Sequence, residues 1–300
     1  MYRVFLVSVS VLALAGCLGG GSSSDDDPPT QGAGGGSGGN GGGTGIGADN
    51  QPFTVTGQAV TTQFTGNGSG EVNGLGPFSG PIDLTLNGSA DTDGNGPDTI
   101  ELVTEDGTVT FNNTNLDYSN TILNGRVRDE GDADGTLLIT TYDDDLEYTA
   151  FGVWAQLPNT EDDPVPGDRL DAGAVGELSE TLPGGSATYS GQSVGVESDG
   201  TDIRLTTSDI SITTDFSDIT VTSSGTLAQS VDDIDNAPVV SAADLDFTAT
   251  GSVTGTGYAA TADDMQVNGA FHGPNAEETG GVFHGTVGGS NYGGAFGAKQ

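Results

Sequence analysis

The sequence contains very little cysteine and very little positive charge. Cys17 is the only cysteine in 300 residues, so a disulfide framework within the chain is excluded. Six Lys and Arg stand against 43 Asp and Glu, which gives a formal net charge of −37. A surface of that charge repels nucleic acid and anionic lipid head groups. Two origins of the acidity stay open: a saline habitat, in which salt screens the self-repulsion, and a basic partner.

Long apolar runs and helical stripes are also scarce. Residues 4–15 are apolar apart from two serines, and this run is shorter than the roughly 20 residues that a membrane-spanning helix needs. It has the length of the apolar core of a signal peptide. No stretch of a dozen residues elsewhere repeats large apolar side chains with helical spacing. These absences predict an exported protein built from β-strands.

Small residues close the apolar run and lead directly into the single cysteine. The tripeptide Leu-Ala-Gly before Cys17 has the pattern of a lipobox, in which small residues fit the signal peptidase and the thiol takes the acyl chains. Acyl chains then hold the protein at the membrane, with about 0.8 kcal/mol for each buried CH₂. We therefore expect a lipoprotein signal peptide over 1–16 and lipidation at Cys17. Leu18 follows in place of an acidic retention residue, which favours the outer membrane.

A Gly-, Ser- and Asp-rich segment separates the cysteine from the rest of the chain. Residues 17–50 hold almost no large apolar side chain after Leu18. We expect this segment to be a disordered, flexible tether with a span of roughly 30 Å, long enough to lift a folded body off the membrane surface.

From Pro52 onward, polar and apolar residues alternate between frequent Gly, Asn and Asp turns. This pattern predicts an all-β protein made of short strands. We expect a β-rich domain over 51–146. The second part, 147–300, carries eight strand candidates, which are residues 148–154, 187–195, 202–215, 218–227, 244–249, 265–273, 281–287 and 291–298. Eight antiparallel strands close into a barrel whose interior side chains just fill, and closure removes the exposed sheet edges.

The C-terminal strands resemble those of a known family. Residues 269–285 contain two Phe-His-Gly triplets, and 293–300 read Gly-Gly-Ala-Phe-Gly-Ala-Lys-Gln. These segments resemble the closing strands of the C-terminal β-barrel domain of transferrin-binding-protein-B-like surface lipoproteins, and 151–154 and 187–191 resemble its first two strands. The resemblance covers about 148–300.

The resemblance implies an eight-stranded antiparallel barrel preceded by a smaller β-rich handle domain. It also implies display on the outer leaflet and, in the best-known members, capture of host iron-carrier proteins. The transferrin receptors have two handle–barrel lobes, whereas this chain has room for one. The first domain shows no counterpart of their transferrin-contacting residues, so none is carried over.

The only two histidines, His272 and His284, lie in the two Phe-His-Gly triplets. By the period of two along a strand, Phe271 and Phe283 fill the barrel interior while the histidines point outward. The histidines then share one face of a hairpin, where they are candidates for lying across from each other and contacting a haem or metal. No third ligand is evident, and two solvated side chains on the barrel exterior are the plainer interpretation.

An acidic loop in the first domain has half the spacing of a calcium site. Residues 91–96 match the first half of an EF-hand loop, but Glu101 falls one position before the required bidentate ligand and no helices flank the loop. A polar β-turn explains the same residues equally well. The candidate calcium ligands are Asp91, Asp93, Asn95 and Asp98. No other cofactor is expected.

No catalytic motif accompanies either histidine, and no phosphate-binding Gly-x-x-x-x-Gly-Lys occurs. A pair of carboxylates brought together by folding stays open as a hydrolase site. We do not expect the protein to be an enzyme. We expect a surface-exposed outer-membrane lipoprotein that only its lipid holds at the membrane. Its expected role is to capture a protein or nutrient ligand, such as an iron or haem carrier. A TonB-dependent receptor is a candidate partner.

The alternative is a structural or adhesive coat protein without a specific small ligand. If the protein captures a partner, exposed aromatic residues in loops are the natural anchors. The candidates are Phe78, Tyr118, Tyr142 and Tyr292.

Overall fold

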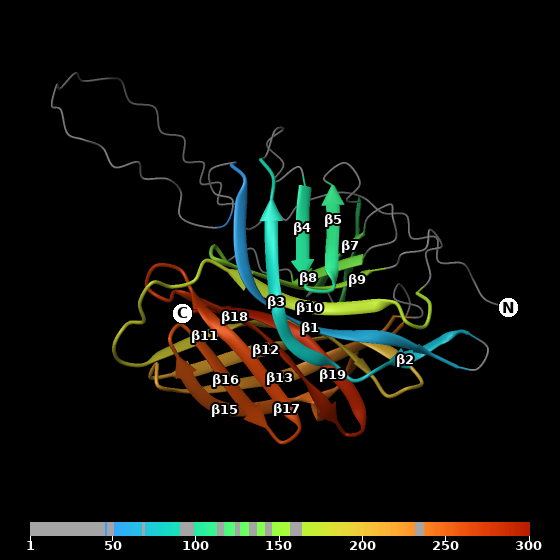
Figure 1. Cartoon of the computed structure of the whole chain (residues 1–300). Helices are drawn as coiled ribbons and strands as arrows, with labels where there is room; N and C mark the ends of the chain where they lie inside the picture. Colours follow the sequence, from blue (N-terminus) through green and yellow to red (C-terminus); the bar gives the residue numbers. More distant parts are fainter. Residues whose placement is uncertain are drawn as a thin grey trace, which may run out of the picture.

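The computed structural model describes residues 46, 51–67, 70–90, 99–112, 117–123, 127–131, 137–141, 146–156, 164–231 and 237–300. Over these ranges the chain is almost entirely β-strand and forms two antiparallel sheets, of which the second closes into a barrel (Figure 1). The all-β prediction is confirmed. Among the described residues, none of the helices has the length and apolar character that crossing a bilayer takes.

The first sheet is a curled ribbon of antiparallel strands, in the order β5-β4-β3-β1-β10-β9-β8-β7-β6, with β2 paired to the end of β1. Its strands are β1 (Phe53–Gly66), β2 (Val72–Leu75), β3 (Ser79–Gly88), β4 (Thr99–Thr104), β5 (Gly107–Asn112), β6 (Asp117–Ile122), β7 (Val127–Gly131), β8 (Leu137–Thr141), β9 (Thr149–Gln156) and β10 (Arg169–Gly176).

The second sheet is an eight-stranded antiparallel barrel. It runs β12-β11-β19-β18-β17-β16-β15-β13 and closes through pairing of β12 with β13. Its strands are β11 (Ala187–Ser198), β12 (Ile203–Thr214), β13 (Asp218–Ser230), β15 (Phe247–Thr254), β16 (Gly257–Ala262), β17 (Met265–His272), β18 (Glu278–Val287) and β19 (Ser290–Lys299). A short strand, β14 (Val240–Ser241), and a 3-10 turn, η3 (Ala243–Leu245), lie between β13 and β15.

The predicted number of barrel strands is confirmed, but one predicted member is wrong. The segment 148–154 lies in β9, which pairs with β10 and β8 of the first sheet. Its place in the barrel is taken by β16, whose sequence Gly-Tyr-Ala-Ala-Thr-Ala offers one large side chain as a signal. β9 is apolar on both faces because it lies between two cores: Val153 belongs to the core facing the barrel and Trp154 to the core of the first sheet.

Aromatic rings fill the barrel interior. Phe271, Phe283 and Phe296 are fully buried there, and the inward prediction for Phe271 and Phe283 is confirmed. The centroid of the Phe283 ring lies 5.0 Å from that of Tyr292 in an edge-on arrangement, a favourable geometry for aromatic pairs. Gly294 makes room for this pair, because a Cβ there would lie 2.5 Å from Cζ of Phe283.

The first sheet lies across the outer wall of the barrel, with β1, β9 and β10 over β18 and β19 (Figure 1). Two rings of the first part of the chain fit against glycines of β19. A Cβ at Gly293 would lie 2.6 Å from the ring of Phe78, and a Cβ at Gly297 would lie 2.6 Å from the ring of Phe151. The first sheet can therefore come this close to the barrel only at positions where β19 has glycine and no side chain.

Replacing Gly297 by Val is expected to push the first sheet away from the barrel and lower the free energy of unfolding by about 1–3 kcal/mol. The added atoms would meet both Phe151 and Leu146. The matched control is Gly184→Val, where a Cβ meets no atom within 4 Å. Urea unfolding followed by circular dichroism compares the two, and equal midpoints would contradict the proposed contact.

Candidate functional site

Several predicted sites fall outside the described residues. Cys17 and the candidate calcium ligands Asp91, Asp93, Asn95 and Asp98 are among them, so lipidation and calcium binding stay predictions. Among the residues that the structure describes, no group of three or more His, Cys, Asp or Glu side chains is placed to hold a metal ion.

The two histidines share the outer face of the β17–β18 hairpin but do not face each other. His272 pairs with Glu278, whereas His284 pairs with Gln266. The two histidines are thus six positions apart along the hairpin, roughly 20 Å at the rise of a β-strand. The predicted haem or metal contact shared by His272 and His284 is therefore wrong, because the period of two fixes a face but not the register.

The plainer interpretation, two solvated histidines, is wrong as well. His272 is 2% exposed and His284 is 7% exposed. Both point out of the barrel, but the first part of the chain covers this wall. Sequence periodicity indicates which side of a strand a residue occupies and is silent on what packs against that side.

His272 lies at the junction between the two sheets. Its Nδ1 atom shares a hydrogen bond of 2.8 Å with Oγ1 of Thr149 on β9. Gly176 leaves the room for the imidazole, because a Cβ there would lie 2.4 Å from Nδ1. Burial lowers the pKa of His272 to about 4, so the ring is neutral at pH 7.

Glu278 joins the same two parts of the chain. Its carboxylate accepts hydrogen bonds from the backbone N–H groups of Glu147, at 2.6 Å, and Tyr148, at 2.9 Å. Burial raises the pKa of Glu278, and these two bonds oppose that rise. The carboxylate therefore caps the backbone that enters β9 and holds it on the barrel wall.

His284 marks a second point of contact with the first part of the chain. Burial lowers its pKa, and a hydrogen bond from its ring to the backbone of Gly80 works in the opposite direction. Together, His272, Glu278 and His284 form a line of buried polar groups along the outer wall of the hairpin. Their neighbours are backbone groups and Thr149 rather than an open cleft, which gives them a positioning role between the two sheets.

Two of the candidate aromatic anchors are buried. Phe78 lies against the barrel wall at Gly293, and Tyr292 is enclosed in the barrel interior. Neither can anchor a partner, so this prediction is wrong for both. Tyr142 and the side chain of Tyr118 lie outside the described residues.

Sequence reasoning missed an ion-pair cluster on the first sheet. The guanidinium of Arg169 contacts Asp171 at 2.7 Å and Asp106 at 3.1 Å, and it also donates to Thr61 and Thr104. Burial raises the pKa of Asp171, while Thr61 and Arg169 lower it. The available signal was the rarity of cations, since only six Lys and Arg stand against 43 Asp and Glu in the chain.

An apolar cavity of about 40 Å³ lies in the core of the first sheet. Pockets for small molecules have volumes of about 300–1,000 Å³ and include convergent polar groups. The side chains that line the cavity are apolar and include Leu84, Leu102 and Trp154. This cavity is therefore too small and too apolar for a haem or a nutrient molecule.

The buried neutral imidazole makes the stability of the fold depend on pH. In the unfolded chain His272 protonates near its ordinary pKa of 6.5, but in the folded chain only near 4. Between these values the unfolded chain binds the extra proton, so the free energy of unfolding falls as the pH falls. We expect His272→Gln to reduce this fall by up to about 1.4 kcal/mol per pH unit.

Urea unfolding at intervals between pH 7 and pH 4.5 measures this dependence for the wild-type chain and the variant. Glu278, whose folded pKa is raised, contributes with the opposite sign, and His284 with the same sign as His272. Both remain in the variant, so the difference between the two curves reports His272. Parallel curves would show that His272 is not the buried neutral group described above.

The comparison with protein families matches the barrel. Residues 182–300 match the family described as the C-lobe and N-lobe beta barrels of Tf-binding protein B. The matched range contains every strand of the closed barrel and none of the first sheet. The predicted resemblance is confirmed for this range: the chain carries a transferrin-binding-protein-B-like barrel.

Several solved structures are similar to this chain at low sequence identity. A mutant of the vaccine antigen transferrin binding protein B from Haemophilus parasuis is 15% identical, with 83% of this chain and 76% of that chain covered and a TM-score of 0.39. A surface lipoprotein is 14% identical, with coverages of 81% and 98% and a TM-score of 0.41. The N-lobe of lactoferrin binding protein B from Moraxella bovis is 12% identical, with coverages of 82% and 98% and a TM-score of 0.34.

A comparison with curated proteins finds no match. The matched family is described by its beta barrels and not as an enzyme family.

Proposed function

We propose that this protein is a lipid-anchored surface lipoprotein of the outer membrane that captures an extracellular protein, such as an iron or haem carrier, without catalysing a reaction. The observation that carries the proposal is the match of the whole barrel to the barrels of transferrin-binding protein B. The lipobox at Cys17 and the Gly-rich tether supply the anchor and the reach that such a protein needs.

The described cores favour a protein partner over a small ligand. Aromatic rings fill the barrel interior, and the cavity in the first sheet is too small for a haem. Recognition is then a matter of the outer surface. Much of that surface is acidic, and Asp199, Asp215 and Asp263 lie in turns at the ends of the barrel. Charge of one sign steers a partner of the opposite sign and makes its association rate depend on salt.

Capture at the surface leaves the bound nutrient outside the cell. A TonB-dependent receptor in the outer membrane is the class of protein that would take it onward, and we propose such a receptor as the second partner.

Substitution of Cys17 by Ser is expected to abolish lipidation and surface display. A hydroxyl group is a poor substitute for the thiol in thioether formation, so the chain loses its acyl anchor. The measurement is incorporation of labelled palmitate, together with access of an antibody to intact bacteria that express the full chain. Leu18→Ala is the matched control and should retain both signals. Labelling of the Ser variant at the wild-type level would contradict lipidation at Cys17.

Binding is tested with the full chain immobilised against transferrin, lactoferrin and free haem as separate probes. We expect saturable binding of a carrier protein, with an association rate that falls as salt is raised from 50 to 500 mM because the surface is acidic. Saturable binding of haem alone would contradict capture of a protein. Failure of every probe to saturate would favour the adhesive coat protein.

A further inference from the structure

The barrel interior has a polar stretch in the middle of β11, β12 and β13. Side chains of three neighbouring strands form a chain of hydroxyl groups there. Ser208 Oγ lies 2.6 Å from Ser193 Oγ and 2.7 Å from Ser223 Oγ. All three residues are buried. These hydrogen-bonded hydroxyl groups lie in a barrel interior whose other side chains are mostly aromatic and aliphatic.

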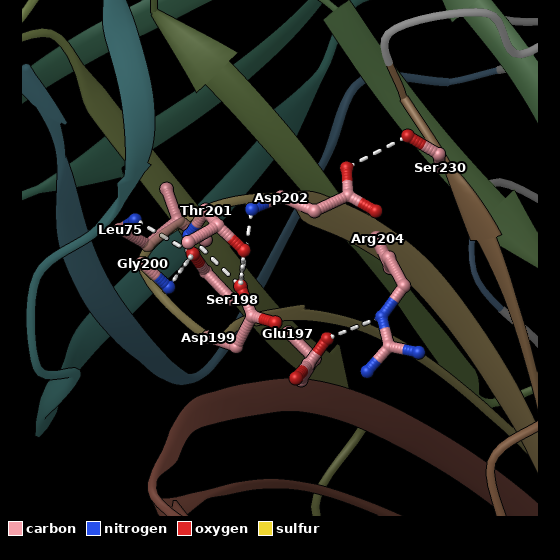
Figure 2. Close-up of polar contacts among 9 residues, drawn as sticks. All are labelled: Leu75, Glu197, Ser198, Asp199, Gly200, Thr201, Asp202, Arg204 and Ser230. Atoms are coloured by element: carbon pink, nitrogen blue, oxygen red, sulfur yellow. Dashed lines mark hydrogen bonds and ion pairs between the residues drawn. The ribbon is translucent and has the colours of Figure 1, made fainter.

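A buried carboxylate lies farther along β11, beside the turn into β12. Glu197 on β11 is 0% exposed, and its Oε2 atom accepts a hydrogen bond of 2.7 Å from Nε of Arg204 on β12. Figure 2 shows the two side chains pointing toward one another beside the turn that joins their strands. The second oxygen, Oε1, is buried and has no hydrogen-bond partner among the described residues.

The turn next to this pair is fastened by its own bonds, so its groups do not reach Oε1. The carboxylate of Asp199 accepts from the hydroxyl and backbone N–H of Thr201 and from the N–H of Asp202. Asp202 accepts in turn from the hydroxyl of Ser230 (Figure 2).

Two of the other buried oxygens that have no hydrogen-bond partner among the described residues belong to barrel strands, Oγ1 of Thr206 and the hydroxyl of Tyr292. The sheet register brings them to Glu197. Tyr292 pairs directly with Glu197 across β19 and β11, and Thr206 follows two positions after Arg204 on β12. Direct and diagonal neighbours on one face of a sheet lie about 5–8 Å apart. The hydroxyl of Tyr292 faces Thr206 and Ser208, although it does not reach the geometry of a hydrogen bond.

Three unsatisfied oxygens in one place require a common partner, because buried polar groups in native proteins almost always have one. That partner must donate to a carboxylate oxygen and accept from a hydroxyl group. A water molecule does both and makes two to four bonds at such sites. A metal cation suits the site less well, because Arg204 already neutralises Glu197 and would repel a second positive charge.

We propose that the barrel interior binds an ordered water molecule that donates to Oε1 of Glu197 and bridges to Thr206 Oγ1 and the hydroxyl of Tyr292. The water extends the Ser193–Ser208–Ser223 chain to the Glu197–Arg204 pair and holds the carboxylate in position at the mouth of the barrel.

A crystal structure of the full chain at a resolution that orders internal water tests the proposal directly. The expected result is water density within hydrogen-bond distance of Glu197 Oε1 and of at least one of the two hydroxyl groups. Density that shows the Tyr292 hydroxyl or an Arg204 Nη atom bonded directly to Oε1, with no water between, would overturn it.

Magnetic relaxation dispersion of water in solution gives a second readout, because internal water exchanges slowly enough to be counted. The double variant T206V/Y292F removes two of the three water partners and should lower the count of long-lived waters by one relative to the wild-type chain. The matched control is Tyr258→Phe, whose hydroxyl is already bonded to Thr279 at 2.8 Å and which should keep the wild-type count. An unchanged count in a folded double variant would refute the bridging water.

Discussion

Contact between the rings of Phe78 and Phe151 and the glycines of β19 is the constraint on which the two-sheet arrangement depends. Side chains ordinarily project from the outer face of a barrel, and they would keep a second sheet away from the barrel backbone. At Gly293 and Gly297 the rings reach the backbone itself. The same strand points Tyr292 and Phe296 inward. β19 thus supports both cores at once.

Polar groups fix the position that this apolar packing allows. His272 and Glu278 sit on the outer face of the β17–β18 hairpin, and both reach the chain just where it enters β9. Apolar contact is largely non-directional, whereas hydrogen bonds require particular distances and angles. The histidines, which the sequence suggested as haem or metal ligands, therefore help to align the two sheets. That alignment sets which loops lie on the same side of the molecule.

The sequence was informative wherever a strand has one buried face. The inward placement of Phe271 and Phe283 and the all-β class follow from alternation alone. Alternation failed for β9, because Val153 and Trp154 contact different cores and the strand appears buried throughout. It also failed for the spacing of His272 and His284, which depends on the hairpin register. It missed the contacts of Arg169 with Thr61, Thr104 and Asp106, which other parts of the first sheet supply. The failures for β9 and Arg169 concern contacts between segments distant in sequence, and the failure for the histidines concerns the register of one hairpin.

The closure of the barrel and the position of β1 imply a particular order of assembly. β1, which lies between β3 and β10 in the first sheet, packs on β18 and β19, two strands that begin more than two hundred residues later in the chain. Contacts of such long sequence separation slow folding. In the exported lipoprotein proposed above, a delay of this kind keeps the N-terminal half of the chain unfolded until its support has also crossed the membrane.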